Sequence, residues 1–267
     1  MEEKIKFIAS DMDGTLLDSA KQLPQEFYDV FDSLKQGEVL FAAASGRQYY
    51  SLLSMFESVA DDMIFIAENG AFVMYQGKEL YSCVIPKDEV HSIIRTVRDI
   101  PNSDVVLCGK NSAYIETAES SKFEEIQNYY HRVECVEDLL EVDDEFIKIA
   151  ILNYEGTEEH VYPVVAEKFG DTHQVVVSAK IWLDFMHKEA SKGTAIRHLQ
   201  GLFDFNFEQS MSFGDYFNDV EMLKETYHSY AMENAHPEIK NLARFTAPHQ
   251  DEQGVLTVIK EKVLNQN

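Results

Sequence analysis

A largely apolar run that ends in two carboxylates constrains this chain more than any other feature. The run Ile5–Ala9 is followed by Asp11–Thr15, whose sequence is D-M-D-G-T. Continuous apolar residues predict a buried parallel strand, and open α/β sheets form ligand sites at the carboxyl ends of such strands. Because Asp11 and Asp13 would repel each other there, a divalent cation is expected, and their oxygens suit Mg²⁺. A simple acidic loop that caps a helix is the alternative.

Composition limits the class of protein. With 267 residues, 45% hydrophobic and 12% aromatic, the chain can form one large or two smaller globular domains. Its net charge is −24, and the sequence has no stripe of lysine and arginine that could neutralise phosphates. We therefore expect no nucleic-acid partner.

The cysteine content and the hydropathy of the sequence indicate in which cellular compartment the protein is expected. Cys83, Cys108 and Cys135 are odd in number and far apart, which argues against a disulfide framework or a zinc ribbon. The sequence contains no signal-peptide core and no apolar run near the ~20 residues that span a bilayer. These features predict a cytoplasmic protein without a membrane partner.

Strand and helix patterns alternate in two separated parts of the sequence. The order strand–helix–strand–helix–strand up to Ala67, and its return after Lys188, predicts a Rossmann-like parallel sheet. The stretch between them predicts an inserted α+β domain, with one helix at 158–169 and an acidic loop across 134–145. The expected fold class is α/β, with a core domain at 1–83 and 189–267 and an inserted domain at 84–188.

Three further polar clusters follow apolar strands or open helices. Ser45-Gly46-Arg47 offers a hydroxyl and free N–H groups that suit a phosphate, although an ordinary helix cap would look the same. Lys192 starts a helix against the dipole preference, which suggests that its ammonium is needed there, unless it is simply solvated. The segment Gly214–Asp219 supplies further carboxylates and an amide, or merely a capped turn.

Taken together, the four clusters favour chemistry over four unrelated caps. All of them are expected at one edge of the same parallel sheet. They supply a nucleophile, a metal site, hydroxyl and backbone donors, and a cation. Phosphoryl transfer needs these components, because the transferred group must be neutralised and held in line with its nucleophile.

The four clusters resemble the four motifs of the haloacid dehalogenase-like (HAD) phosphatases. The insertion and its α+β pattern resemble the Cof-type subfamily, whose cap is of type IIB. The similarity covers the whole chain, including Glu68–Ala71, Met232–Lys240 and Asp251–Val255. Glu233 departs from the usual glycine of the family, and we expect only a local loop difference from it.

The resemblance implies a role for each motif residue. Asp11 would be the nucleophile that becomes an aspartyl phosphate, and Asp13 the general acid and base. The implied metal site comprises Asp11, Asp13 (through its backbone carbonyl), Asp215 and Asp219, with Asp219 orienting Lys192 or a metal-bound water. The implied phosphate ligands are Ser45, the Met12 and Gly46 amides, Lys192 and Asn218, and Arg47 could reach the phosphate or the substrate body.

The inserted domain bears on the substrate. Residues 84–188 hold 21 acidic and 10 basic residues, a net charge of −11, which disfavours a large polyanion. A small phosphorylated metabolite, with sugar phosphates first, is therefore expected, and the protein is expected to be a monomer or weak homodimer. In this family the cap touches the substrate beyond the phosphate. The candidate contacts are Lys180, Trp182, Asp184 and His187, although Trp182 and Phe185 are more typical of a cap core.

For the other aromatic and histidine residues the sequence indicates only a general location. Tyr216 and Phe217 could line the entrance to the site or pack against the sheet. His131, His160 and His173 lack metal-ligand spacing and are expected on the surface.

Other functions remain open at this point. Phosphohexose mutases and phosphotransferases can share this core and cap, and they differ in the lifetime of the aspartyl phosphate. A non-catalytic sugar-phosphate sensor is disfavoured by the intact Asp11 and Asp13. A dehalogenase is disfavoured by Asp13 and by the complete metal site.

Overall fold

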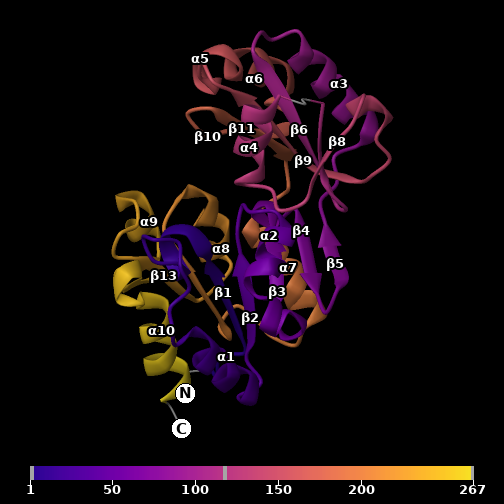
Figure 1. Cartoon of the computed structure of the whole chain (residues 1–267). Coiled ribbons are helices and arrows are strands. Elements are labelled where there is room, and N and C mark those ends of the chain that lie inside the picture. Colours follow the sequence, from indigo (N-terminus) through magenta and orange to yellow (C-terminus); the bar gives the residue numbers. More distant parts are fainter. Residues whose placement is uncertain (1–2, 117–118, 266–267) are drawn as a thin grey trace. The chain divides into compact units, whose positions relative to one another are not determined.

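The computed structural model describes residues 3–116 and 119–265, which form two compact units (Figure 1). The first unit, here called the core, comprises the described residues up to Tyr81 and from Ser191 onward. The second, here called the cap, is Ser82–Ala190. The bounds expected from the sequence for the inserted domain were 84–188.

The core is built on an eight-stranded sheet with the order β14-β13-β12-β1-β2-β3-β4-β5. The first six of these pair in parallel, and β4 runs antiparallel to β3. This arrangement confirms the predicted parallel sheet. The strands are β1 (Phe7–Asp11), β2 (Leu40–Ala44), β3 (Ile64–Ala67), β4 (Phe72–Tyr75), β5 (Lys78–Ser82), β12 (Ser210–Gly214), β13 (His228–Met232) and β14 (Phe245–Ala247).

Both faces of this sheet are buried, because apolar side chains of the strands pack against apolar side chains of the core helices. On one face, alternate residues of β1, β2 and β3 pack with α7 and α8 in a single buried cluster. On the other face, Phe27 of α1 contacts Phe41 and Phe56 with ring centroids 5.7 and 5.4 Å apart. The core helices are α1 (Phe27–Gln36), α2 (Tyr49–Met55), α7 (Lys192–Leu202), α8 (Val220–Lys224), α9 (Pro237–Leu242) and α10 (Gly254–Ile259).

The order of the strands brings the polar clusters together. β1 lies between β2 and β12. The strands β2 to β5 lie on one side of β1, and the strands β12 to β14, which come later in the sequence, lie on the other side. Such a switch point leaves a crevice at the carboxyl ends of the strands, where ligands bind in open α/β sheets. The chain continues from β1 into Met12, from β2 into Ser45 and from β12 into Asp215.

The cap carries its own sheet, with the order β10-β11-β9-β6-β7-β8. Its neighbouring strands are antiparallel except for the parallel pair of β7 and β8. The strands are β6 (Ser103–Gly109), β7 (Ala113–Ile115), β8 (Val133–Cys135), β9 (Phe146–Asn153), β10 (His173–Ala179) and β11 (Trp182–His187). The helices are α3 (Lys87–Arg98), α4 (Ser120–Gln127), α5 (Thr157–His160) and α6 (Tyr162–Phe169).

Three expectations for the cap were wrong. The single helix at 158–169 is broken at Val161, and α6 begins at Tyr162 with Pro163, which lacks an N–H group, in its first turn. The acidic stretch is not all loop, because β8 pairs with β7. His173 is buried rather than on the surface, with its ring near Phe169 and Phe185. Trp182 and Phe185 are buried, as expected.

None of the helices in residues 3–116 and 119–265 combines the length and apolar character that would let it cross a membrane.

Candidate active site

The loop after β1 presents Asp11 and Asp13 at the carboxyl end of the sheet. Asp11 ends the strand and is 5% exposed. The turn Met12–Leu16 follows, closed by a hydrogen bond from the Leu17 N–H to the Met12 carbonyl at 2.9 Å. Gly14 has φ +87°, and a Cβ there would come within 2.4 Å of Asp215 Oδ2. The glycine therefore permits both the backbone conformation and the close approach of a second loop.

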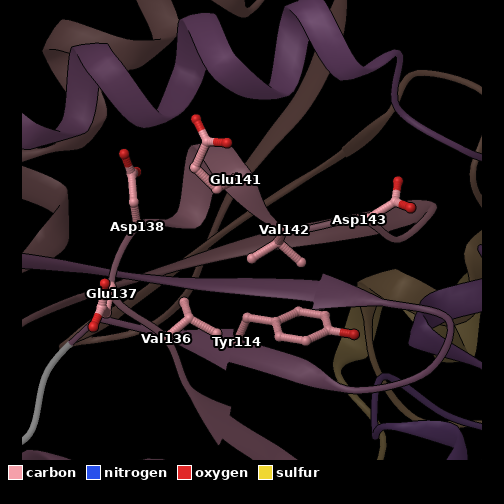
Figure 2. Close-up of a pocket in the computed structure, with 7 residues that line it drawn as sticks. All are labelled: Tyr114, Val136, Glu137, Asp138, Glu141, Val142 and Asp143. Atoms are coloured by element: carbon pink, nitrogen blue, oxygen red, sulfur yellow. The ribbon is translucent and has the colours of Figure 1, made fainter.

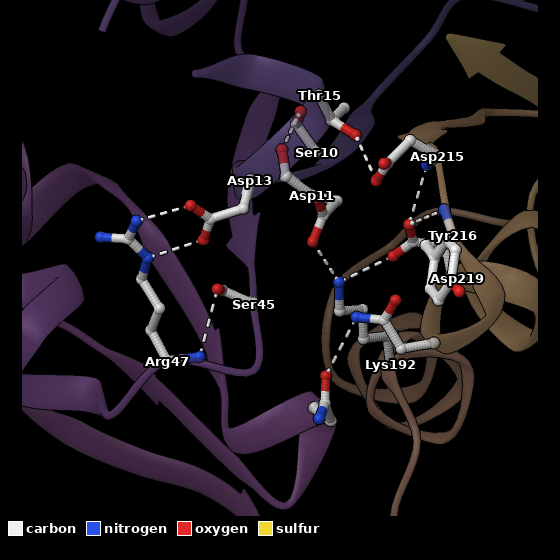
Figure 3. A network of polar contacts seen from close by, with 12 residues as sticks. Ser10, Asp11, Asp13, Thr15, Ser45, Arg47, Lys192, Asp215, Tyr216 and Asp219 are labelled. Carbon is white, nitrogen blue, oxygen red and sulfur yellow. Dashed lines mark hydrogen bonds and ion pairs between the residues drawn. The ribbon is translucent and has the colours of Figure 1, made fainter. Parts of the chain in front are cut away.

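Lys192 lies at the centre of the site and is completely buried (Figure 3). Its Nζ donates to Asp11 Oδ1 at 2.5 Å and to Asp219 Oδ1 at 2.7 Å. The Ser191 hydroxyl caps α7 by accepting a hydrogen bond from the Thr194 N–H. The structure thus favours the functional interpretation of Lys192 over a solvated surface lysine.

The loop after β12 places two more carboxylates beside this lysine. Asp219 Oδ2 accepts hydrogen bonds from the N–H groups of Asp215 and Tyr216 at 2.9 and 3.3 Å. Thr15 Oγ1 donates to Asp215 Oδ1 at 3.4 Å. Asp219 is therefore used on both oxygens, one by the lysine and one by the backbone, and it fixes the shape of the loop.

The charges in the site shift the pKa values of its members. Burial, and then the neighbouring Asp219, raise the pKa of Asp11 well above its usual value, against the opposing effect of Lys192. The same two causes raise the pKa of Asp215 to about 6. Burial by itself would lower the pKa of Lys192, but Asp11 and Asp219 outweigh it and raise that pKa. One buried ammonium thus leaves the carboxylates incompletely neutralised.

This cluster fits a hard divalent cation. Asp11, Asp215 and Asp219 each offer a carboxylate oxygen, and these oxygens lie within 4.8 Å of one another. Asp11 Oδ2 is buried without a hydrogen-bond partner among the described residues. Because a buried, unpartnered carboxylate oxygen is unfavourable, the donor set suits Mg²⁺, which prefers oxygen ligands.

The loop after β2 carries Ser45, Gly46 and Arg47. The Ser45 hydroxyl accepts a hydrogen bond from the Arg47 N–H at 3.2 Å. The Arg47 guanidinium forms a two-point pair with Asp13, from Nε to Oδ2 at 2.7 Å and from Nη2 to Oδ1 at 2.6 Å. Arg47 is therefore paired with Asp13, the residue expected to act as general acid and base. The motif spacing did not reveal this pairing.

Asn69 joins two of these loops and was given no role from the sequence. It follows β3 with φ +54°. Its Oδ1 accepts a hydrogen bond from Asn218 Nδ2 at 3.2 Å, and a Cβ on Gly46 would come within 3.1 Å of its amide. Asn69 thus connects two of the residues expected to bind phosphate. Its position after a buried parallel strand was the available signal.

Asn234 supports the loop after β1 from the other side. Its Nδ2 donates to the Gly14 carbonyl at 2.7 Å, and its Oδ1 accepts from the Gln250 N–H at 3.1 Å. It belongs to the segment Met232–Lys240 that carries the family resemblance. Besides that resemblance, the sequence signal for this role was an asparagine in a loop between a strand and a helix.

The cap residues proposed as substrate contacts do not share one environment. Trp182 is buried, with Tyr129 and Tyr130 near its ring, whereas Lys180 is exposed. Asp184 and His187 are half-buried.

A separate hollow of about 340 Å³ occurs within the cap (Figure 2). It is lined by Tyr114, Val136, Glu137, Asp138, Glu141, Val142 and Asp143. None of the four motifs contributes to it.

Comparisons with known proteins agree with this geometry. A sequence model described as haloacid dehalogenase-like hydrolase matches residues 8–259. The 5-amino-6-(5-phospho-D-ribitylamino)uracil phosphatase YbjI of Escherichia coli is 33% identical over 262 residues, covering 97% of this chain and 96% of its own.

Solved structures show the same fold. A Streptococcus mutans protein has a TM-score of 0.86 at 27% identity, covering 98% of this chain and 100% of its own. A sugar phosphatase of HAD subclass IIB has a TM-score of 0.77 at 21% identity, covering 96% of this chain and 98% of its own. Because the family model spans nearly the whole chain and carries the four clusters with it, this protein belongs to the haloacid dehalogenase-like hydrolases, among their Cof-type phosphatases.

Proposed function

We propose that this phosphatase hydrolyses small phosphate monoesters in an Mg²⁺-dependent reaction that proceeds through a phosphoryl group on Asp11. The observation that carries the proposal is the environment of the Asp11 carboxylate. One oxygen accepts a hydrogen bond from the buried Lys192, and the other is buried and unpartnered among the described residues. A carboxylate held in this way is oriented and poorly solvated, which makes it a competent nucleophile.

The metal site would comprise the carboxylates of Asp11 and Asp215 and the backbone carbonyl of Asp13. Mg²⁺ bound there would supply charge neutralisation for the phosphoryl oxygens. Asp219 would support the site without binding the metal directly, because both of its oxygens already accept hydrogen bonds from Lys192 and the loop backbone.

Asp11 and Asp13 would divide the chemistry between them. In the first step an Asp11 oxygen forms a bond to phosphorus, the ester P–O bond breaks, and the Asp13 carboxyl gives its proton to the leaving oxygen. In the second step the Asp13 carboxylate takes a proton from water as that water attacks phosphorus. Inorganic phosphate leaves and the Asp11 carboxylate is restored.

The remaining residues would bind the phosphoryl oxygens. The Ser45 hydroxyl, the N–H groups of Met12 and Gly46, the Asn218 amide and the Lys192 ammonium are all suitable donors. Lys192 can serve both the nucleophile and the phosphate because its ammonium has three donors.

We further propose a sugar phosphate or a phosphorylated sugar alcohol as the substrate. The net charge of −24 disfavours polyanions. The Escherichia coli relative is named a 5-amino-6-(5-phospho-D-ribitylamino)uracil phosphatase, which makes phosphorylated ribityl compounds the first esters to assay. We also propose that the protein acts in the cytoplasm as a monomer or weak homodimer.

Phosphate release from a panel of small monoesters, with Mg²⁺ and with EDTA, tests the proposal. We expect release that requires the metal and is lost in Asp11→Asn. The matched control is Asp29→Asn, which changes an exposed aspartate of α1 and should retain activity. Absence of release from every ester, with folded protein, would contradict the phosphatase proposal. Transfer of the phosphoryl group to an added sugar instead of water would indicate a phosphotransferase.

A further inference from the structure

The segment between β13 and α9 contacts both of the loops that carry expected metal ligands. Asn234 Nδ2 donates a hydrogen bond to the Gly14 carbonyl at 2.7 Å, in the loop after β1. The His236 N–H donates to the Asp215 carbonyl at 2.9 Å, in the loop after β12. One short segment, residues 234–236, therefore holds the backbone of both loops, and we refer to it as the bridging segment.

The two loops approach each other closely where the bridging segment holds them. A Cβ on Gly14 would come within 2.4 Å of Asp215 Oδ2, so a glycine is needed at this point. The hydrogen bond from Thr15 Oγ1 to Asp215 Oδ1 is long, at 3.4 Å, and the bridging segment supplies shorter ones. Gly14 directly follows Asp13, so the contact that fixes Gly14 also restrains the adjoining peptide, which contains the Asp13 carbonyl.

The carboxamide of Asn234 is used at both of its ends. Its Nδ2 donates to Gly14, and its Oδ1 accepts a hydrogen bond from the Gln250 N–H at 3.1 Å. A carboxylate of the same size could not make both contacts, because it has acceptors only. Next to Gln250, Asp251 Oδ1 accepts from the Ser19 N–H at 2.7 Å, later in the loop after β1. The C-terminal part of the core therefore anchors Asn234 and this loop together.

The spacing of these loops matters most for a small cation. Mg²⁺ requires near-ideal octahedral geometry with oxygens at about 2.0–2.1 Å, whereas Ca²⁺ accepts oxygens at about 2.3–2.6 Å in flexible arrangements. A shift of a few tenths of an ångström between the loops would therefore weaken Mg²⁺ binding more than Ca²⁺ binding. Residues that orient metal ligands without binding the metal commonly change its affinity about 10- to 100-fold when they are replaced.

We propose that Asn234 is a positioning residue, which sets the spacing between the loops of Asp13 and Asp215 and thereby favours Mg²⁺ over Ca²⁺ at the proposed metal site. This inference rests on the metal site of the proposed function and adds a determinant of metal preference to it. Asn234 acts through the Gly14 carbonyl and not as a ligand, because its carboxamide is already bound to backbone groups at both ends.

Calorimetric titration of the metal-free protein with Mg²⁺ and with Ca²⁺ tests this proposal without any substrate. In Asn234→Ala, which removes both contacts, the Kd for Mg²⁺ should rise about tenfold and the Kd for Ca²⁺ less than about twofold. The ratio of the Ca²⁺ Kd to the Mg²⁺ Kd should therefore fall about fivefold. Asn234→Asp keeps the size of the side chain and the contact with Gln250 but cannot donate to Gly14. Its added charge should strengthen the binding of both ions, and the ratio should fall here as well.

Asn153→Ala is the matched control. Asn153 lies in β9 of the cap, and its carboxamide also joins two backbone groups. Its Nδ2 donates to the Pro101 carbonyl at 3.2 Å, and its Oδ1 accepts from the Glu155 N–H at 2.9 Å. Because Asn153 is completely buried, its replacement should lower the melting temperature at least as much as Asn234→Ala, yet leave the ratio of the two Kd values unchanged.

The outcomes separate this inference from the proposed function. A ratio that both Asn234 variants change by less than twofold, an equal fall of the ratio in Asn153→Ala, or a parent protein that binds Ca²⁺ more tightly than Mg²⁺ would overturn the inference. A ratio that depends on Asn234, without hydrolysis of any monoester, would retain the inference and reject the phosphatase proposal. Metal-dependent hydrolysis with an unchanged ratio would do the reverse. A parent protein that binds no Mg²⁺ would reject the metal site and the inference together.

Discussion

The Arg47 guanidinium holds the Asp13 carboxylate through two hydrogen bonds, of 2.7 and 2.6 Å. Asp13 follows β1 and Arg47 follows β2, so the pair connects two adjacent loops of the site. The Asp13 carboxylate, together with its hydrogen bonds, raises the pKa of Arg47 despite partial burial. The pair fixes the orientation of the group that we expect to move the proton.

Arg47→Lys should lower kcat/KM for phosphate monoesters about tenfold. A lysine keeps the positive charge but cannot make the two-point contact that orients Asp13. Steady-state kinetics with a small monoester measures the effect. The control is Arg197→Lys, whose guanidinium bonds Glu225 at 2.7 Å outside the site. Equal kinetics in the parent protein and Arg47→Lys would show that the pair has no part in turnover.

Lys192→Met should lower the free energy of unfolding by about 3 kcal/mol and abolish turnover. Methionine fills similar space, but it leaves the buried carboxylates of Asp11 and Asp219 without their cation. Urea unfolding in EDTA measures the loss. Lys78→Met, which changes an exposed lysine in β5, should stay within about 0.5 kcal/mol of the parent. A loss below about 1 kcal/mol for Lys192→Met would argue that the buried ion pairs are not needed for stability.

Metal-free protein should lose stability as the pH rises from about 4 through about 6. The pKa of Asp215 is raised from 3.8 to about 6, so the native state binds a proton that the unfolded state has already released. The stabilising effect is complete below pH 4 and is lost above pH 6. We expect it to reach about 1–2 kcal/mol after allowance for solvent screening.

Asp215→Asn isolates this effect and tests the metal. In EDTA the variant should be more stable than the parent at pH 7.5, and the difference should vanish near pH 4. Addition of Mg²⁺ should raise the melting temperature of the parent but not that of the variant. A parent melting temperature that Mg²⁺ leaves unchanged would refute a metal site at Asp215.

Asn69→Gly should weaken inhibition by inorganic phosphate about five- to tenfold. Glycine accepts the φ of +54° at this position, so the substitution removes the carboxamide that orients Asn218 without straining the backbone. Asn102→Gly is the control, because Asn102 has φ +56° at a surface position of the cap. Unchanged inhibition in Asn69→Gly would mean that Asn218 needs no such support.

The core of the fold could be predicted because its signals are local. Continuous apolar residues in β1, β2 and β12 indicate buried parallel strands, and the carboxyl ends of such strands must meet at one edge. For that reason Lys192 was expected at the same edge of the sheet as Asp11 and Asp219, although these residues lie 181 and 27 positions away in the sequence. That Asp219 orients Lys192 was one of two roles implied by the family resemblance.

The remaining features depend on contacts that a local pattern does not contain. β8 has too few apolar residues to signal a strand, and it forms because β7 offers it a backbone edge. His173 looks polar in the sequence, yet Phe169 and Phe185 enclose its ring. The pairing of Arg47 with Asp13 depends on side-chain rotamers in two loops, which motif spacing does not specify.

The most direct test of the proposed mechanism is the reaction of Asp13→Asn with p-nitrophenyl phosphate in the presence of Mg²⁺. The nitrophenolate ion leaves without a proton, so the first step should proceed, whereas the second step lacks its general base. We predict a burst of p-nitrophenolate equal to the protein concentration, with the phosphoryl group found on Asp11 by peptide mapping. A phosphoryl group on any other residue, or no burst from a folded variant whose parent turns the ester over, would contradict Asp11 as the nucleophile.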